Sequence, residues 1–312
     1  MSKEAIQKRS RLRTPNNRTT TGFRVSDELW AVLQPLLPVH VNTHRFGGGR
    51  PRVPDRACAD AIFYVLRTGC QWHALDQTEL CAHSTAHDRF QLWVEAGVFL
   101  KLWQAGVERF DELCSIEWDW LAMDGALTKA PLGGEKTGPN PIDRGKSGVK
   151  RSLLVEGHGV PIGLVAEGAN RHDMKLVRST VESLVVARPE PIKERQQGMC
   201  LDAGYDYDEV YAILKEFGFT AHVRARGEEA KAIKREAGFK ARRWVVERSH
   251  SWMNRFRRLL IRWDKKPENY VAFLHFACGV LAFRAAGVLG EAVSPTDDLE
   301  GIHGVTTQQQ PS

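Results

Sequence analysis

Long apolar runs are missing from this 312-residue sequence. No stretch approaches the ~18 consecutive apolar residues that a membrane-spanning helix needs, so an integral membrane protein is excluded. The N-terminal residues are basic, as at the start of a signal peptide, but no apolar stretch follows them, which argues against secretion. A Walker-type phosphate loop is also missing, so nothing in the sequence indicates a requirement for ATP.

Cysteine is scarce and scattered. The six cysteines form no Cys-x-x-Cys pair and mostly lie in apolar or helical sequence. We therefore expect buried, reduced thiols and a cytoplasmic protein. The spacing of Cys70, His73, Cys81, His83 and His87 matches no common zinc finger, so ordinary side chains of a helical region explain this group better than zinc does.

The sequence does contain enough apolar material for a folded core. Hydrophobic residues make up 42% of the chain, and nine residues are tryptophan. This composition excludes global disorder. At about 100–200 residues per domain, the length predicts two domains.

Charge is unevenly distributed along the chain. The formal net charge is only +6, from 44 Lys and Arg against 38 Asp and Glu. Residues 1–24 carry seven basic residues and one acid, and residues 222–266 carry fifteen Lys or Arg and five Asp or Glu, which leaves the remainder at −10. Two basic blocks on an acidic body indicate a polyanionic partner.

The first part of the chain consists of a predicted arm followed by short helices. Residues 1–24 are polar and basic with little to bury, which predicts a disordered arm. Residues 25–114 contain several helical patterns, including one that Ser26 can cap and one that stops at Gly69. We expect a small all-α domain of helix-turn-helix type.

Residues 115–288 predict a mixed α/β domain. An alternating, Trp-rich stretch at 116–123 predicts a strand ending at Asp124, and the Gly-His-Gly turn at 157–159 predicts a hairpin. The remaining expected elements are strands at 198–202 and 219–223 and helices at 172–187, 206–217, 241–262 and 268–286. Residues 289–312 resemble a disordered tail.

Two acids follow apolar strands in this second part. Asp124 and Asp202 stand at expected strand ends, where an unpaired carboxylate is a costly core residue. Adjacent strands lie about 4.8 Å apart, so carboxylates at their ends converge. A turn-initiating role accounts for either residue alone about equally well.

A third acid, Glu247, lies on the polar side of the expected helix 241–262. At about 100° per residue, apolar side chains such as Trp252 and Phe256 fall on the opposite side. The polar and basic side chains around or flanking Glu247 are Arg243, Arg248, His250, Ser251, Asn254, Arg255, Arg257, Arg258 and Arg262. A solvated amphipathic helix explains the apolar stripe, but it explains less well why one acid stands among so many arginines.

Three carboxylates in a basic surround fit phosphodiester chemistry with two Mg²⁺ ions. The acids would hold the ions, one ion activating the attacking oxygen and the other stabilising the leaving oxygen. Mg²⁺ prefers carboxylate and water ligands, so no His or Cys cluster is needed. The arginines would hold backbone phosphates on either side of the scissile bond.

Longer motifs carry these residues across about 26–288. They are LAMDG at 121–125, KAPLGGE at 129–135, DRGK at 143–146, GANRHD at 168–173, LDAGY at 201–205, RRWVVER at 242–248 and WMNRFRR at 252–258. Together they resemble bacterial insertion-sequence transposases with a DDE catalytic core, of the insertion-sequence-four/five type. The resemblance implies an RNase H-like fold in which Asp124, Asp202 and Glu247 are the catalytic, metal-binding triad.

The family's signature around the glutamate is Tyr-x2-Arg-x3-Glu-x6-Lys. Arg243 matches its arginine. Lys240 and Asn254 stand where the family has Tyr and Lys, and Arg255 or Arg258 could supply the missing charge. These departures concern the grip on the flanking DNA and leave the triad intact.

The Gly- and Lys-rich loop at 129–150 is long for a structureless connection, so we expect a functional loop near DNA. His172 and Asp173 begin an expected helix, and a capping role explains them. The residues expected to contact DNA are Lys129, Lys146, Arg243, Arg248, Asn254, Arg255, Arg257 and Arg258.

We therefore expect a DNA transposase. It would bind the terminal inverted repeats of its insertion sequence through residues 25–114, and cut and join DNA through residues 115–288 with two Mg²⁺ ions, for which Mn²⁺ can substitute. Its partners would be double-stranded DNA and a second copy of the chain, in the bacterial cytoplasm at the nucleoid, with no membrane and no ATP. Two alternatives remain: a non-catalytic DNA-binding repressor of the element, and an RNase H-like nuclease acting on host DNA.

Overall fold

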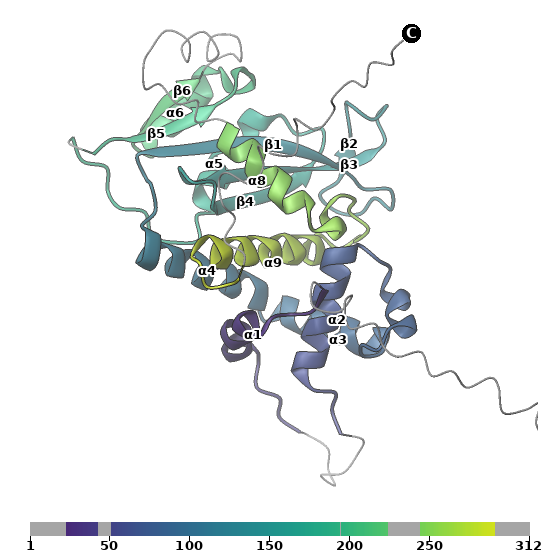
Figure 1. Cartoon of the computed structure of the whole chain (residues 1–312). Helices are drawn as coiled ribbons and strands as arrows, with labels where there is room; N and C mark the ends of the chain where they lie inside the picture. The colour runs from purple at the N-terminus through teal and green to yellow at the C-terminus, as the bar shows by residue number, and fades with distance from the viewer. Residues whose placement is uncertain (1–22, 43–50, 194, 224–243, 291–312) are drawn as a thin grey trace, which may run out of the picture.

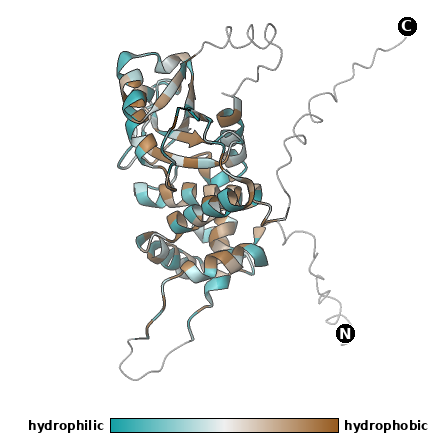
Figure 2. Cartoon of the chain, turned by 90° about the vertical axis from the view of Figure 1, so that its left-hand side faces the viewer, coloured by the Kyte–Doolittle hydropathy of each residue, from teal (hydrophilic) through white to brown (hydrophobic). Residues whose placement is uncertain are grey.

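The computed structural model describes residues 23–42, 51–193, 195–223 and 244–290. In this part of the chain a mixed β-sheet lies above layers of helices (Figure 1). The same stacking is visible after a 90° turn (Figure 2). Most of the expected N-terminal arm and C-terminal tail, and the part of the basic block at 224–243, lie outside the described residues.

Helices form the N-terminal part, as expected. They are α1 (Asp27–Leu33), α2 (Asp55–Thr68), α3 (His83–Glu95) and α4 (Val98–Cys114), with the 3-10 turns η3 (Gln34–Leu36) and η4 (Trp72–Gln77). Ser26 caps α1, because its side-chain oxygen accepts a hydrogen bond from the Leu29 amide at 3.2 Å. Gly69 ends α2 at a φ of 70°, in the left-handed region that favours glycine.

A six-stranded mixed sheet follows. Its strands are β1 (Trp120–Lys129), β2 (Gly138–Pro139), β3 (Ser147–Val155), β4 (Pro161–Gly168), β5 (Gln197–Leu201) and β6 (Phe219–Val223). The main strands lie in the order β4-β3-β1-β5-β6, and the short β2 pairs with the start of β3. Strands β4, β3 and β1 pair antiparallel, whereas β1, β5 and β6 pair parallel. This order and these directions are those of an RNase H-like sheet, so the expected fold class is confirmed.

Helices cover both faces of the sheet. They are η5 (Asp173–Leu176), α5 (Val177–Glu182), η6 (Ala203–Tyr205), α6 (Asp208–Glu216), α8 (Trp244–Asn254), η7 (Arg257–Leu259) and α9 (Pro267–Ala285). Ser152 on β3 bonds Thr180 of α5 at 2.8 Å, and the adjacent Arg151 bonds Asn254 of α8 at 3.2 Å. Because neighbouring strand residues point to opposite faces, α5 and α8 lie on opposite sides of the sheet.

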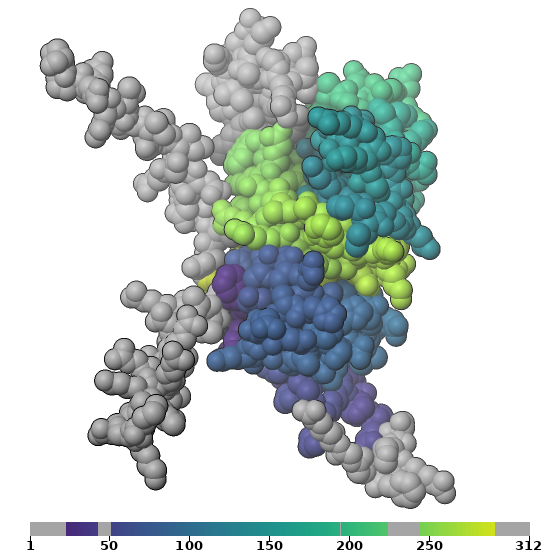
Figure 3. Space-filling view, turned by 90° about the vertical axis from the view of Figure 1, so that its right-hand side faces the viewer, coloured from purple at the N-terminus to yellow at the C-terminus, as the bar shows by residue number. Residues whose placement is uncertain are grey.

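The helix α9 joins the two parts of the molecule. Thirteen of its 19 residues are buried, so only a narrow side of this helix faces solvent. Figure 3 shows the yellow-green α8–α9 segment between the teal sheet part and the blue N-terminal helices. The Phe273 ring of α9 stacks on Phe90 of α3 at 4.5 Å, and one hydrophobic cluster runs from Val25 to Leu289. The helical part and the sheet therefore share a core. None of the helices in the described ranges is both long and apolar enough to cross a membrane.

Asp124 does not end a strand, contrary to expectation. β1 continues to Lys129 because residues 122–129 all pair with residues of β3. An aspartate is uncommon within strands, which is why the pattern suggested a stop there. The expected loop at 129–150 likewise contains β2 and the first residues of β3.

The expected helix 241–262 was also wrong in its length, since α8 ends at Asn254. Beyond it the amides of Arg255 and Phe256 bond carbonyls only three residues back, and Phe256 is extended. The Arg262 amide then bonds the Lys129 carbonyl at 2.8 Å, which ties the chain to the end of β1. Residues after Asn254 therefore do not share a helical face with Glu247. The expected helix 172–187 is similarly shorter, consisting of η5 and α5.

Candidate active site

Asp124 and Asp202 lie level on neighbouring strands. In the parallel pairing of β1 and β5, Ala122 stands opposite Cys200, and each aspartate follows two residues later. Asp202 comes directly after β5, as expected, whereas Asp124 lies inside β1. One oxygen of each carboxylate accepts a nearby backbone amide at 2.8 Å. These hydrogen bonds hold the two carboxylates in place at the centre of the sheet.

Glu247 reaches the site from α8, which lies across β1 and β3 (Figure 1). It is exposed and stands in the first turn of that helix. The opposite side of α8 is buried, with Val246 and Met253 fully inside the core. The helix thus buries one side against the sheet and leaves the carboxylate in solvent.

The electrostatics of Asp124 show that the acids are neighbours. Burial, as the largest cause, and the negative charges of Asp202, Glu247 and Asp173 together raise the pKa of Asp124 to about 6. The hydrogen bond from the Gly125 amide opposes this shift. Asp202 and Glu247 therefore lie close enough to Asp124 for their charges to act on it.

The residues at this site fit a divalent cation. A cation that lies between carboxylates reduces the repulsion among them, and carboxylate oxygens are the ligands that Mg²⁺ prefers. Burial, together with the nearby positive charge of Arg151, lowers the pKa of His250 to about 3, so this imidazole is neutral and adds no competing charge.

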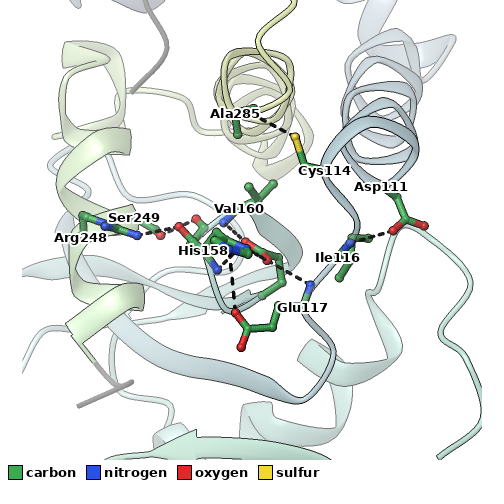
Figure 4. Close-up of polar contacts among 11 residues, drawn as sticks. Asp111, Cys114, Ile116, Glu117, His158, Val160, Arg248, Ser249 and Ala285 are labelled. Atoms are coloured by element: carbon green, nitrogen blue, oxygen red, sulfur yellow. Dashed lines mark hydrogen bonds and ion pairs between the residues drawn. The ribbon is translucent and has the colours of Figure 1, made fainter. Parts of the chain in front are cut away.

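The hairpin between β3 and β4 fixes the helix that carries Glu247 (Figure 4). Ser249 Oγ donates to the Gly159 carbonyl, and Arg248 Nη2 donates to the His158 carbonyl, both at 2.6 Å. The fully buried Glu156 holds the turn in shape by accepting two of its backbone amides at 2.9 Å. Arg248, expected to contact DNA, is half-buried and takes part in this docking.

Most of the other expected DNA contacts are accessible. The exposed members of the set are Lys129, Lys146, Asn254, Arg255 and Arg257. Lys129 pairs with Asp143 at 3.4 Å, and Asn254 accepts from the buried Arg151. Arg243 lies outside the described residues.

Arg258 is buried, contrary to the prediction that it contacts DNA. Its side chain is 5% exposed, and its Nη2 lies 2.9 Å from Asp264 Oδ1. The neighbouring Arg262 is also buried and donates to the carbonyls of Glu135, Lys136, Asp264 and Lys265. Both arginines hold the chain after α8 in place, because the long helix expected there does not form.

A partly buried ion pair lies behind the site, on the sheet face opposite α8. Lys150 Nζ is 2.7 Å from Asp173 Oδ2, and the Lys150 side chain is only 9% exposed. A Cβ atom on Gly125 would collide with Asp173, so the residue after Asp124 must be small. The sequence placed Lys150 in a DNA-facing loop and Asp173 in a helix cap. Side chains alternate between the two faces of β3, and this alternation could have predicted that Lys150 points inward, toward Asp173. His172 does act as a cap, accepting from the Met174 amide.

The five residues weighed for zinc do not come together as a set. Cys81 Sγ lies 4.0 Å from Cys58 Sγ, and all six cysteines are free thiols. Among the described residues, His73 and His83 do meet, and the third group beside them is Asp76.

Two family models match this chain. The model described as "Putative transposase of IS4/5 family" matches residues 25–103, and the model described as "Transposase DDE domain" matches residues 119–281, more than half of the chain. The boundary between them falls where the helical part gives way to the sheet.

Two relatives and one solved structure are similar to parts of this chain. The chain is 30% identical over 154 residues to "Putative transposase for insertion sequence element IS402" of Burkholderia cepacia, which covers 48% of this chain and 70% of that protein. It is also 30% identical over 118 residues to an uncharacterized IS402 protein of the same organism, covering 38% of this chain and 80% of that one. The catalytic domain of the Mos1 mariner transposase aligns over 62% of this chain and 94% of its own, at 9% identity and a TM-score of 0.26.

The "Transposase DDE domain" match spans the strands and helices that carry Asp124, Asp202 and Glu247. With the IS402 relative and the RNase H-like sheet, it establishes that this chain belongs to the DDE transposase family, whose members cleave and join DNA.

Proposed function

We propose that Asp124, Asp202 and Glu247 form the catalytic centre and hold two Mg²⁺ ions, for which Mn²⁺ can substitute. What carries this proposal is the placement of three carboxylates on β1, directly after β5 and on α8, where the charges of Asp202 and Glu247 add to the effect of burial in raising the pKa of Asp124. The ions would supply an activated oxygen nucleophile and stabilise the leaving oxygen. The chain's own part is to hold the carboxylates in register, through strand pairing and the docked α8.

The exposed basic residues around the site would hold the DNA backbone. Arg255 and Arg257 follow α8 directly, and Lys129 ends the strand that carries Asp124. Lys146, Asn254 and Arg243 complete the set, while Arg248 would contribute at the edge of its docking contact. Arg258 is left out because it is buried against Asp264.

Residues 25–114 would bind the terminal inverted repeats of the element, and residues 115–288 would carry the chemistry. The shared core through α9 would keep these two activities in a fixed geometry. Cutting at two element ends requires two active sites, so we expect a homodimer on DNA, acting without ATP in the bacterial cytoplasm at the nucleoid.

The decisive experiment compares Asp124→Asn with the wild-type protein on DNA carrying the element's ends and Mg²⁺. The variant should lose cleavage and strand transfer while still binding the ends, because the change removes a metal-binding charge without altering the helical part. Glu209→Gln is a matched control, since Glu209 is a carboxylate outside the proposed triad that pairs with Lys175 in solvent at 2.8 Å. Unchanged strand transfer by Asp124→Asn would overturn the proposal. A wild-type protein that binds the ends without cutting them would instead indicate a repressor, and cleavage independent of the ends a nuclease.

A further inference from the structure

A second cluster of metal-ligating side chains lies in the helical part, outside the DDE site. His73 and Asp76 belong to η4, and His83 is the first residue of α3. One ligand atom of each residue lies within 4.8 Å of those of the other two. The His73 and His83 rings are 3.8 Å apart between centroids. Two imidazoles and a carboxylate from separate segments therefore meet at one point of the surface.

The hydrogen bonds of Asp76 already orient this cluster. Asp76 Oδ1 accepts from the His83 backbone amide at 3.0 Å, and Asp76 Oδ2 lies 2.6 Å from His83 Nδ1. These two hydrogen bonds lower the pKa of Asp76, so its carboxylate is ionised. A carboxylate can only accept, so His83 Nδ1 carries the proton between them. Asp76 and His83 therefore share one proton, and a metal ion could take the place of that proton.

The close approach of the two rings places two nitrogen ligands beside each other, with the ring planes tilted by 41°. Imidazole is the commonest metal ligand in proteins, so this arrangement is suited to metal binding.

We infer that His73, Asp76 and His83 form a binding site for a divalent transition metal of the Zn²⁺ class. The metal would replace the proton between His83 Nδ1 and Asp76, with His73 as third ligand and water in the remaining position. Tetrahedral Zn²⁺ with bonds of about 2.0–2.1 Å places its ligands about 3.3 Å apart, so small side-chain rotations suffice to close the site. The two imidazole nitrogens select against Mg²⁺, which takes oxygen ligands.

Such a metal would fasten η4 to the start of α3. These segments are otherwise joined at this point by the bonds of Asp76 to His83, which are accessible to water. Because its ligands belong to η4 and α3 and include none of the DDE residues, the metal would stabilise the helical part and would not be one of the ions of the phosphodiester chemistry. This inference stands whether or not the triad assignment is right.

The test is Zn²⁺ titration of the full-length protein by calorimetry, in millimolar Mg²⁺ so that the acidic site is saturated. The wild type should bind Zn²⁺ with release of a proton, seen as a dependence of the heat on the buffer, and binding should weaken at acidic pH as imidazole is protonated. His73→Ala and His83→Ala should each reduce the affinity at least tenfold.

His87→Ala is the matched control, because His87 lies one turn further along α3 with its ring against Trp72 at 5.2 Å. It should bind Zn²⁺ as the wild type does. Thermal unfolding adds a second readout: Zn²⁺ should raise the Tm of the wild type and of His87→Ala, but not that of His73→Ala. Equal affinities for the wild type and His73→Ala, or loss of binding in His87→Ala alone, would overturn the inference.

Discussion

At the scale of single residues, the charge of Asp124 sets a conflict between stability and function. Its pKa is raised from an ordinary value near 4 to about 6, mainly by burial. A raised carboxyl pKa stabilises the folded state at low pH, and this stabilisation is lost as the pH rises through about 6. At neutral pH the ionised Asp124 therefore destabilises the metal-free protein.

The change Asp124→Asn should accordingly stabilise the metal-free protein at pH 7 by roughly 1–3 kcal/mol, at 1.36 kcal/mol per pKa unit. The gain should shrink as the pH is lowered from 7 to 4, because the wild-type carboxyl group is then protonated. Chemical denaturation in EDTA at several pH values measures it. A gain that did not depend on pH would show that packing, and not charge, is responsible.

The Lys150–Asp173 pair is a residue-scale feature of a different kind. Changing Lys150 to Met should cost roughly 1–3 kcal/mol, because Asp173 Oδ1 is buried and already finds no partner among the described residues. Adding Asp173→Asn should recover part of this loss, since the two residues are coupled. A double-mutant cycle by urea denaturation measures the coupling, and additive effects would show that the pair is not an interacting unit.

At the scale of elements, the segment after α8 divides its arginines into two kinds. Arg262 bonds four carbonyls and is buried, whereas Arg255 and Arg257 are exposed. Arg262→Met should destabilise the fold by roughly 2–4 kcal/mol, because the buried Arg262 side chain joins four carbonyls that would all lose their donor. Arg257→Met, the matched control on the same segment, should change the stability by less than about 0.5 kcal/mol. Thermal unfolding distinguishes the two.

The same exposed arginines should govern the salt dependence of DNA binding. Arg255→Ala and Arg257→Ala should each weaken binding and reduce the slope of log affinity against log salt by about 0.9, the contribution of one phosphate contact. Binding isotherms at several salt concentrations measure this slope. A lowered affinity with an unchanged slope would indicate that the side chain does not contact phosphate.

Sequence reasoning succeeded at this scale where the signal was local. The Ser26 cap, the stop at Gly69 and the turn at 157–159 depend on neighbouring residues, and each is present in the structure. It failed where contacts between segments distant in the sequence determine the local structure. The end of α8 at Asn254 depends on the bond from Arg262 to Lys129, and the inward side chain of Lys150 depends on Asp173.

The three acids were predicted from their own segments: Asp202 from its place after an apolar strand, Glu247 from its place among arginines, and Asp124 from a strand end that the structure places later, at Lys129. Their convergence, however, depends on the pairing of β1 with β5 and on the docking of α8 at the hairpin, which no local pattern encodes. The burial of Arg258 was missed for the same reason, because it follows from the premature end of the helix.

At the scale of the whole molecule, α9 makes the two parts interdependent. Phe273→Ala should cost about 3–5 kcal/mol, since the ring is fully buried and stacks on Phe90. We expect hydrogen exchange to show α3 and β1 losing protection together, because both depend on the same core. Leu113→Ala, at a half-exposed position of α4, is the control with little effect. Loss of protection in α3 alone would show that the parts unfold separately.

The place of α9 in the order of synthesis has a consequence for the cell. The ribosome makes the N-terminal helices first, but the residues that fill the space between them and the sheet come at 267–285, after all the strands of the sheet. A nascent or prematurely terminated chain would expose the aromatic surface that α9 covers. Such fragments would be cleared or would aggregate, instead of persisting as partial proteins that occupy the element's ends and block them.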